Sequence, residues 1–248
     1  SSVFANKKFI KYFLQLFSKD GAAVEAVIKK DPPKLFFITH QILSCLDHLK
    51  RAFGQRVKVV QMVRHPLYLI DHWMSYIDMH GNSERDFTIW LDNYSSPPTP
   101  WFSASWRDEY DQMEKIEKVL KSLETLMEPV YQCVESSDES VLVIPFEKFV
   151  LQPNGYLKEL EQFVSAGVTN QTRGVMKNQR VPREFVSAGP VKSIYKRYAF
   201  NGRDSSLSDI EEYRIKRDRF CNSFGHENSL YLNDLEEKYS CTFDISFG

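Results

Sequence analysis

The segment from Val57 to Tyr76, VKVVQMVRHPLYLIDHWMSY, constrains the fold more than any other part of the chain. It begins with a run rich in β-branched residues, which is typical of a short strand covered on both faces. The run stops at Arg64 and His65, and Pro66 is well suited to the first turn of a helix. A strand, a tight turn and a helix in this order predict an α/β protein with a parallel sheet.

Arg64 would then lie at the carboxyl end of a strand, directly before a helix. The first turn of a helix has free backbone N–H groups and the positive end of the helix dipole. Together with the guanidinium group, these donors would form a site for an anion. The anions that we expect are phosphate and sulfate.

A second strand is predicted at Lys34 to His40, KLFFITH, followed by a helical stretch from Gln41 to Phe53. If both strands belong to one parallel sheet, His40 and Arg64 emerge at the same edge, where open α/β sheets bind their ligands. A neutral imidazole can take the proton of a hydroxyl group that attacks an electrophile. His40 is therefore a candidate general base beside a candidate anion site.

The order of these features resembles the sulfotransferase family that uses 3′-phosphoadenosine 5′-phosphosulfate (PAPS). The shared features are Thr39-His40, about two dozen further residues, and a hydrophobic strand that ends in R-x-P before a helix. The resemblance implies that His40 is the general base and that Arg64 binds the 3′-phosphate of PAPS. It also implies a three-layer α/β/α fold with a central, mainly parallel sheet, as in P-loop NTPases.

The family places a serine eight residues after that arginine, whereas position 72 of this chain is histidine. An N–H group of His72 could serve the 3′-phosphate as a serine hydroxyl does. Ser75 lies almost one helical turn further on and faces nearly the same side. We prefer His72 for this role, with Ser75 as the second choice.

The resemblance continues downstream and covers about Leu35 to Phe185 in all. The stretch VLVIPFEKFV, with Phe146 and Glu147, stands where the family has a strand and a Tyr-Glu segment. The stretch KNQRVPREF falls where many members have a basic loop that returns to the 3′-phosphate. The residues that the resemblance selects from this loop are Arg180 and Arg183, with Lys177 behind them.

The family also opens with a strand, a phosphate loop rich in Gly, Ser and Thr, and a helix. No GxxxxGK[ST] motif occurs in this chain, and its early glycines, Gly21 and Gly54, are isolated. The segment from Ser1 to Val27 has apolar residues at helical intervals instead. We expect that the chain begins after the phosphate loop or that the protein has lost it.

The remaining organisation predicts a single domain over residues 1–248. Residues 81–108 are irregular and aromatic, with Trp90, Tyr94, Trp101 and Trp106 among them. Planar side chains can stack on sugars or aromatic rings, so this segment is a candidate acceptor-binding lid. A secondary hydrophobic cluster is an equally good interpretation.

Composition excludes some classes of function. The net charge of −1, from 32 basic and 33 acidic residues, does not predict a nucleic-acid-binding protein. The four cysteines have no metal-like spacing, and we expect no metal. No run of 18 apolar residues predicts a membrane span. We expect a cytoplasmic enzyme, or one of the Golgi lumen if an anchor precedes Ser1; the oligomeric state is not predicted.

The function that follows from the resemblance is transfer of a sulfuryl group from PAPS to a hydroxyl or amine. The acceptor would be a small molecule or a carbohydrate, and the product of PAPS would be 3′,5′-adenosine bisphosphate. Two alternatives stay open: a non-catalytic binding module with this fold, and an enzyme of nucleotide or phosphoryl transfer. Structural roles also compete, because Arg64 could pair with a carboxylate, His72 could be a core histidine, and Arg180 and Arg183 could be solvated charges.

Overall fold

The computed structural model describes residues 36–39, 41–79, 90–92, 99–190 and 207–247. The chain divides into two compact units, residues 1–40 and residues 41–248, and all the elements below belong to the second. In the first unit, the described residues Phe36 to Thr39 are exposed and belong to no strand or helix. The strand predicted at Lys34 to His40 is therefore not present in its described part. His40 itself and the helix predicted from Ser1 to Val27 lie outside the described residues.

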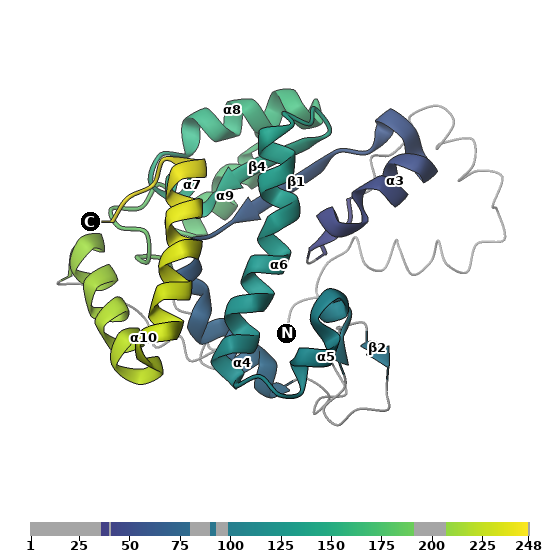
Figure 1. Ribbon diagram of the computed structural model, residues 1–248. Coiled ribbons are helices and arrows are strands. Elements are labelled where there is room, and N and C mark those ends of the chain that lie inside the picture. The colour runs from purple at the N-terminus through teal and green to yellow at the C-terminus, as the bar shows by residue number, and fades with distance from the viewer. Residues whose placement is uncertain (1–35, 40, 80–89, 93–98, 191–206, 248) are drawn as a thin grey trace, which may run out of the picture. The chain divides into compact units, whose positions relative to one another are not determined.

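Two strands form the parallel sheet of the second unit, β1 (Val59–Val63) and β4 (Val141–Pro145) (Figure 1). Their register places Val63 beside Pro145, so both strands end at the same edge. Parallel neighbours need a long crossover connection, which here contains several helices. The predicted class, helices combined with a parallel sheet, is confirmed at this level.

The two faces of β1 differ. Val59 and Val63 are buried, whereas Val60 and Met62 are 42% and 46% exposed. The sequence predicted a strand covered on both faces, and for the described part of the chain this prediction is wrong. The physical reason is that successive side chains of a strand point to opposite faces of the sheet, and the described residues leave the face with Val60 and Met62 partly uncovered.

Helices make up most of the remaining described chain, and a small antiparallel pair of strands accompanies them. Most helices are short, and the two long ones come at the middle and at the end of the chain. The elements other than β1 and β4 are η2 (Ile42–Cys45), α3 (Leu46–Phe53), η3 (Gly54–Arg56), η4 (Pro66–Leu69), α4 (Ile70–Met79), β2 (Trp90–Asp92), β3 (Thr99–Pro100), η5 (Trp101–Trp106), α5 (Arg107–Tyr110), α6 (Lys115–Glu135), α7 (Phe146–Leu151), α8 (Pro153–Val164), α9 (Asn170–Asn178) and α10 (Asp209–Phe243).

The long helix α6 begins at a capping box. The side chain of Glu114 accepts from the backbone of Glu117, and the side chain of Glu117 accepts from the backbone of Glu114. Val119, Leu120 and Leu123 then fall on one face at helical spacing and are buried. This face packs against α4 and α10, which joins the middle of the chain to its end.

The last helix, α10, bends at Gly225, where it turns back on itself (Figure 1). The φ angle of Gly225 is 77°, a value that side chains other than glycine rarely adopt. The residues before and after Gly225 form the two helical halves of α10. The bend allows the two halves to contact different elements, and the first half packs near η4.

Two hydrophobic clusters form the core. One contains Val59 and Val63 of β1 with Tyr239 and Phe243 of α10. Burial of each such side chain contributes about 1.5–3 kcal/mol to folding. This cluster fixes the strand end that carries Arg64 against the C-terminal helix.

The other cluster contains aromatic residues of the predicted lid. Phe102 and Trp106 are buried against Trp73 of α4 and Leu120 of α6. Buried rings cannot stack on an acceptor, so Phe102 and Trp106 belong to the core, as the alternative interpretation of a hydrophobic cluster predicted. Residues 81–89 and 93–98 of the predicted lid lie outside the described residues.

Candidate functional site

The turn after β1 has the local structure that its sequence predicts. The strand ends at Val63, Arg64 follows it, and His65 precedes Pro66 at the first position of η4. The helical path continues directly into α4. Arg64 therefore lies at the carboxyl end of a parallel strand, where α/β sheets place their ligand-binding residues.

The guanidinium group of Arg64 lies over two aromatic rings. Its Cζ atom is 4.9 Å from the centre of the Phe146 ring and 5.4 Å from the centre of the Tyr68 ring. Phe146 follows β4 as Arg64 follows β1, so the parallel pairing brings both residues to one edge. Cation–π attraction of this kind contributes about 0.5–2 kcal/mol and holds the guanidinium group in place.

Arg183 reaches the same ring from the loop after α9. Its Cζ atom is 5.3 Å from the centre of Phe146, and its Nη1 donates to the carbonyl of Val186 at 2.7 Å. The backbone N–H of Arg183 donates to the carbonyl of Val150, also at 2.7 Å, which ties the loop to α7. Arg64 and Arg183, which were selected from distant parts of the sequence, thus meet at one side chain.

Arg64 has unused hydrogen-bonding capacity. Its Nε is buried without a hydrogen-bond partner, and no carboxylate of the described residues lies within ion-pair distance of it. Burial lowers the pKa of its guanidinium group, and the negative charge of Glu147 acts in the opposite direction. Arginine nevertheless stays protonated in proteins, so the group keeps its charge. The residue as a whole is half-buried, so solvent reaches part of it.

Glu147 occupies part of the predicted anion site. Its side chain is only 1% exposed and accepts from the backbone N–H of His65 at 3.0 Å and from the hydroxyl of Tyr239 at 2.8 Å. The sequence predicted that the N–H groups at this helix start are free, and for His65 that prediction is wrong. The reason is tertiary, because the end of β4 brings a carboxylate to the same edge.

His65 is a buried residue of the turn, and its side chain is uncharged. Its ring is buried, with Nδ1 3.9 Å from Oε1 of Glu236, and Glu236 forms an ion pair with Arg217. Burial, followed by the charges of Arg217 and Arg64, lowers the pKa of His65 to about 3. His65 therefore packs in the core as an uncharged aromatic residue and holds the turn in place.

The two residues that the sequence proposed in place of the family serine lie on α4. His72 is exposed, and its ring is stacked on Tyr76 with the ring centres 6.4 Å apart. The hydroxyl of Ser75 donates to the carbonyl of Asp71 at 3.1 Å. An exposed His72 is not a core histidine, and the recorded bond of Ser75 keeps its proton within the helix.

The three basic residues selected from the loop after α9 differ in their exposure. Lys177 and Arg180 are exposed, whereas Arg183 is half-buried at Phe146. Arg180 has a φ angle of 54°, and its backbone N–H donates to the carbonyl of Lys177. Of the three basic residues that the resemblance selected, Arg183 is the one that the structure places with Arg64.

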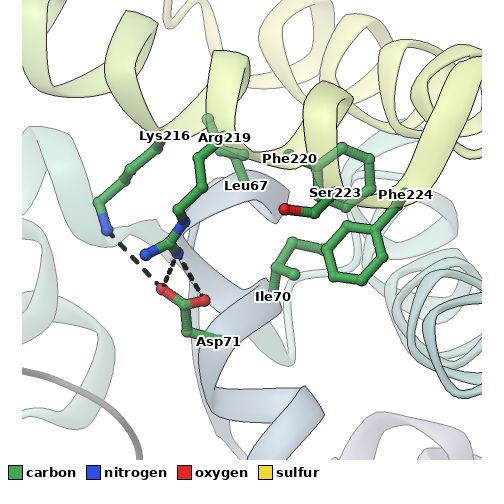
Figure 2. A pocket seen from close by; sticks show the side chains of 8 residues that line it. All are labelled: Leu67, Ile70, Asp71, Lys216, Arg219, Phe220, Ser223 and Phe224. Atoms are coloured by element: carbon green, nitrogen blue, oxygen red, sulfur yellow. Dashed lines mark hydrogen bonds and ion pairs between the residues drawn. The ribbon is translucent and has the colours of Figure 1, made fainter.

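A small hollow of about 90 Å³ lies between α10 and the start of α4 (Figure 2). Lys216 and Arg219 of α10 point toward Asp71 of α4. Nη2 of Arg219 donates to Oδ1 and Oδ2 of Asp71, at 2.7 and 2.6 Å. Nζ of Lys216 lies 4.0 Å from Oδ2 of the same carboxylate. The other residues around the hollow are Leu67, Ile70, Phe220, Ser223 and Phe224.

Sequence reasoning missed three residues of the site. Phe146 and Glu147 were noted for their resemblance but given no role, although they directly follow a predicted strand as Arg64 does. Tyr68 was not considered, although it lies four residues after Arg64, a spacing that places side chains on one face of a helix. Both signals were present in the sequence.

Comparison with known protein families, with curated proteins and with solved structures found no match to this chain. Within the described ranges, no helix is both long and apolar enough to cross a membrane. The same residues contain no group of three or more His, Cys, Asp or Glu side chains that could hold a metal ion.

Proposed function

We propose that this protein transfers a sulfuryl group from PAPS to a hydroxyl or amine of a small molecule or carbohydrate. The observation that carries the proposal is the meeting of Arg64 and Arg183 at Phe146, next to the carboxyl ends of two parallel strands. The sequence resemblance selects both arginines for one ligand, the 3′-phosphate. Their common position in the fold supports that assignment.

The residues at this site suit a phosphate group. Two guanidinium groups supply positive charge and planar donors, which match the oxygens of a phosphate. The buried Nε of Arg64 has a hydrogen that no described residue accepts. Each hydrogen bond between such a donor and a charged oxygen contributes about 1.5–3 kcal/mol.

The reaction that we propose is an in-line displacement. The acceptor oxygen or nitrogen forms a bond to sulfur while the bond between sulfur and the 5′-phosphate oxygen breaks. The proton of the acceptor passes to His40, and 3′,5′-adenosine bisphosphate leaves. Arg64 and Arg183 hold the 3′-phosphate and so position the donor, and positioning is a large part of catalysis in group transfer.

The fold proposed with this function is a three-layer α/β/α arrangement around a larger, mainly parallel sheet. The free side of β1 supports it, because parallel strands are normally paired and covered on both faces.

The test is transfer of label from sulfur-labelled PAPS to a panel of hydroxylated and amino acceptors, with the full-length protein. We expect His40→Ala to lower the transfer rate by at least about tenfold, since a general base contributes that much or more. His48→Ala, which changes an exposed histidine of α3, is the matched control and should leave the rate unchanged. Equal rates for His40→Ala and the unaltered protein would remove His40 from the base role.

Binding without transfer would identify a different function. Calorimetry with 3′,5′-adenosine bisphosphate measures binding independently of chemistry. Tight binding with no transfer to any acceptor would favour the non-catalytic binding module. Transfer from ATP that depends on Mg²⁺ would favour phosphoryl transfer instead.

A further inference from the structure

Tyr68 of η4 is a buried tyrosine whose hydroxyl is not satisfied. Its side chain is 9% exposed, and the oxygen is buried with no hydrogen-bond partner in the part of the chain that the structure describes. Burying a hydroxyl group without a partner is unfavourable, and buried polar groups in proteins nearly always have one. The position therefore suggests a ligand that supplies the missing acceptor.

Arg64, which lies over the Tyr68 ring, also has an unsatisfied donor. The Tyr68 ring lies 5.4 Å from Cζ of Arg64, and Nε of Arg64 is likewise buried without a partner. A phenol O–H and a guanidinium N–H both donate. A group with several acceptor oxygens and negative charge would satisfy both atoms, whereas a cation or a second donor would satisfy neither.

The phenol keeps the proton that it would donate. Burial raises the pKa of Tyr68, and the carboxylates of Glu212 and Asp209 raise it further, against the opposite effect of Arg64. Both carboxylates already accept hydrogen bonds, Glu212 from the hydroxyl of Ser187 and Asp209 from the backbone N–H of Val186. Tyr68 is therefore a neutral donor throughout the physiological pH range.

We infer that the hydroxyl of Tyr68 is a ligand of the phosphate bound at Arg64, in the role for which His72 and Ser75 were considered. The inference rests on the proposed function, because the phosphate in question is the 3′-phosphate of PAPS. Ser75 donates to a carbonyl of its own helix, and His72 is exposed. Tyr68 is closer to Arg64 in sequence than either, and its ring contacts the guanidinium group.

The test uses Tyr68→Phe, which removes the hydroxyl and keeps the ring under Arg64. Calorimetry with 3′,5′-adenosine bisphosphate should show affinity about tenfold weaker, as expected for the loss of one hydrogen bond to a charged group. Affinity for 5′-AMP, which lacks the 3′-phosphate, should not change. Tyr110→Phe is the matched control, because Tyr110 is also buried but belongs to the other hydrophobic cluster. An unchanged affinity of Tyr68→Phe for the bisphosphate would overturn the inference.

Inorganic phosphate separates this inference from the proposed function. With ¹³C-labelled tyrosine in the full chain, phosphate should shift the ring-carbon signal that Tyr68→Phe removes. If phosphate shifts this signal but the bisphosphate does not bind, the proposed function fails and the role of Tyr68 stands. If the bisphosphate binds and neither anion shifts the signal, Tyr68 is not a phosphate ligand and the proposed function stands. If neither anion binds, both are overturned.

Discussion

Two arginines of this protein, Arg64 and Arg219, have opposite surroundings. Arg219 is 61% exposed and donates to both oxygens of Asp71, which is 39% exposed (Figure 2). Arg64 lies over the rings of Phe146 and Tyr68, with its Nε buried and unpaired. Arg219 therefore forms an ion pair within the chain, whereas the buried Nε of Arg64 has no hydrogen-bond partner among the described residues.

The difference shows which of two basic sites can serve an external anion. An exposed ion pair contributes only about 0–1 kcal/mol, and a ligand there would have to displace Asp71. A guanidinium group held by aromatic rings keeps its donors available and has already lost part of its hydration. We therefore expect changes around Arg64 to affect binding and stability more than equivalent changes around Arg219.

The largest effect is expected at the carboxylate of Glu147, which holds the turn that carries Arg64. Glu147→Ala leaves the N–H of His65 and the hydroxyl of Tyr239 buried without an acceptor. The free energy of unfolding should fall by about 3 kcal/mol, as measured by chemical denaturation. Glu147→Gln keeps one acceptor oxygen, so its free energy of unfolding should fall by less. A loss for Glu147→Ala as small as that for Asp71→Ala would remove the contrast between the two regions.

The next effect concerns pH and His65. Its pKa is about 3 in the folded protein and about 6.5 in the unfolded chain, so between these values only the unfolded chain takes up the proton. Stability therefore falls as pH falls below about 6.5. Between pH 7 and pH 5, the free energy of unfolding of the native protein should fall by about 2 kcal/mol more than that of His65→Phe. Chemical denaturation at each pH measures both. His48→Gln should follow the native protein, and parallel curves for all three proteins would contradict a buried neutral His65.

A smaller effect is expected from Gly189→Ala, which disturbs Arg183 without removing its charge. A Cβ atom at this position would lie 2.5 Å from Nη2 of Arg183, so the guanidinium group must move. Affinity for 3′,5′-adenosine bisphosphate should fall by about fivefold in calorimetry, since a displaced donor loses part of its hydrogen bond. Gly174→Ala, where nothing lies within 4 Å, is the control and should bind as the native protein does.

The smallest effect is expected at Asp71. Asp71→Ala removes the ion pair with Arg219, whose members are 39% and 61% exposed. Chemical denaturation should show a change of no more than about 0.5 kcal/mol in the free energy of unfolding. A change of several kcal/mol would mean that the ion pair at the hollow is a major source of stability.

The sequence predicted those features that depend on local pattern. The β-branched run before Arg64 and the proline after it specify a strand, a turn and a helix start, and the structure has all three. The juxtaposition of Arg64 with Arg183 could not be predicted from local pattern, because only the resemblance to a family connects these two distant segments.

The features that the sequence did not predict depend on tertiary contacts. The carboxylate of Glu147 reaches the N–H of His65 only because β1 and β4 pair in parallel. The rings of Phe102 and Trp106 are core because α4 and α6 cover them, and aromatic composition alone fits a lid equally well. The role of Tyr68 becomes visible only when the partners of its hydroxyl are known.

The central claim is that Arg64, held on aromatic rings, binds the 3′-phosphate and that Arg219 does not. Calorimetry of 3′,5′-adenosine bisphosphate with the native protein, Arg64→Gln and Arg219→Gln tests it most directly. We expect Arg64→Gln to bind about 100-fold more weakly, because it loses the charge and the hydrogen bonds to the phosphate. We expect Arg219→Gln to bind within about twofold of the native protein, since its charge is already paired with Asp71. Equal losses for the two variants, or no loss for Arg64→Gln, would contradict the claim.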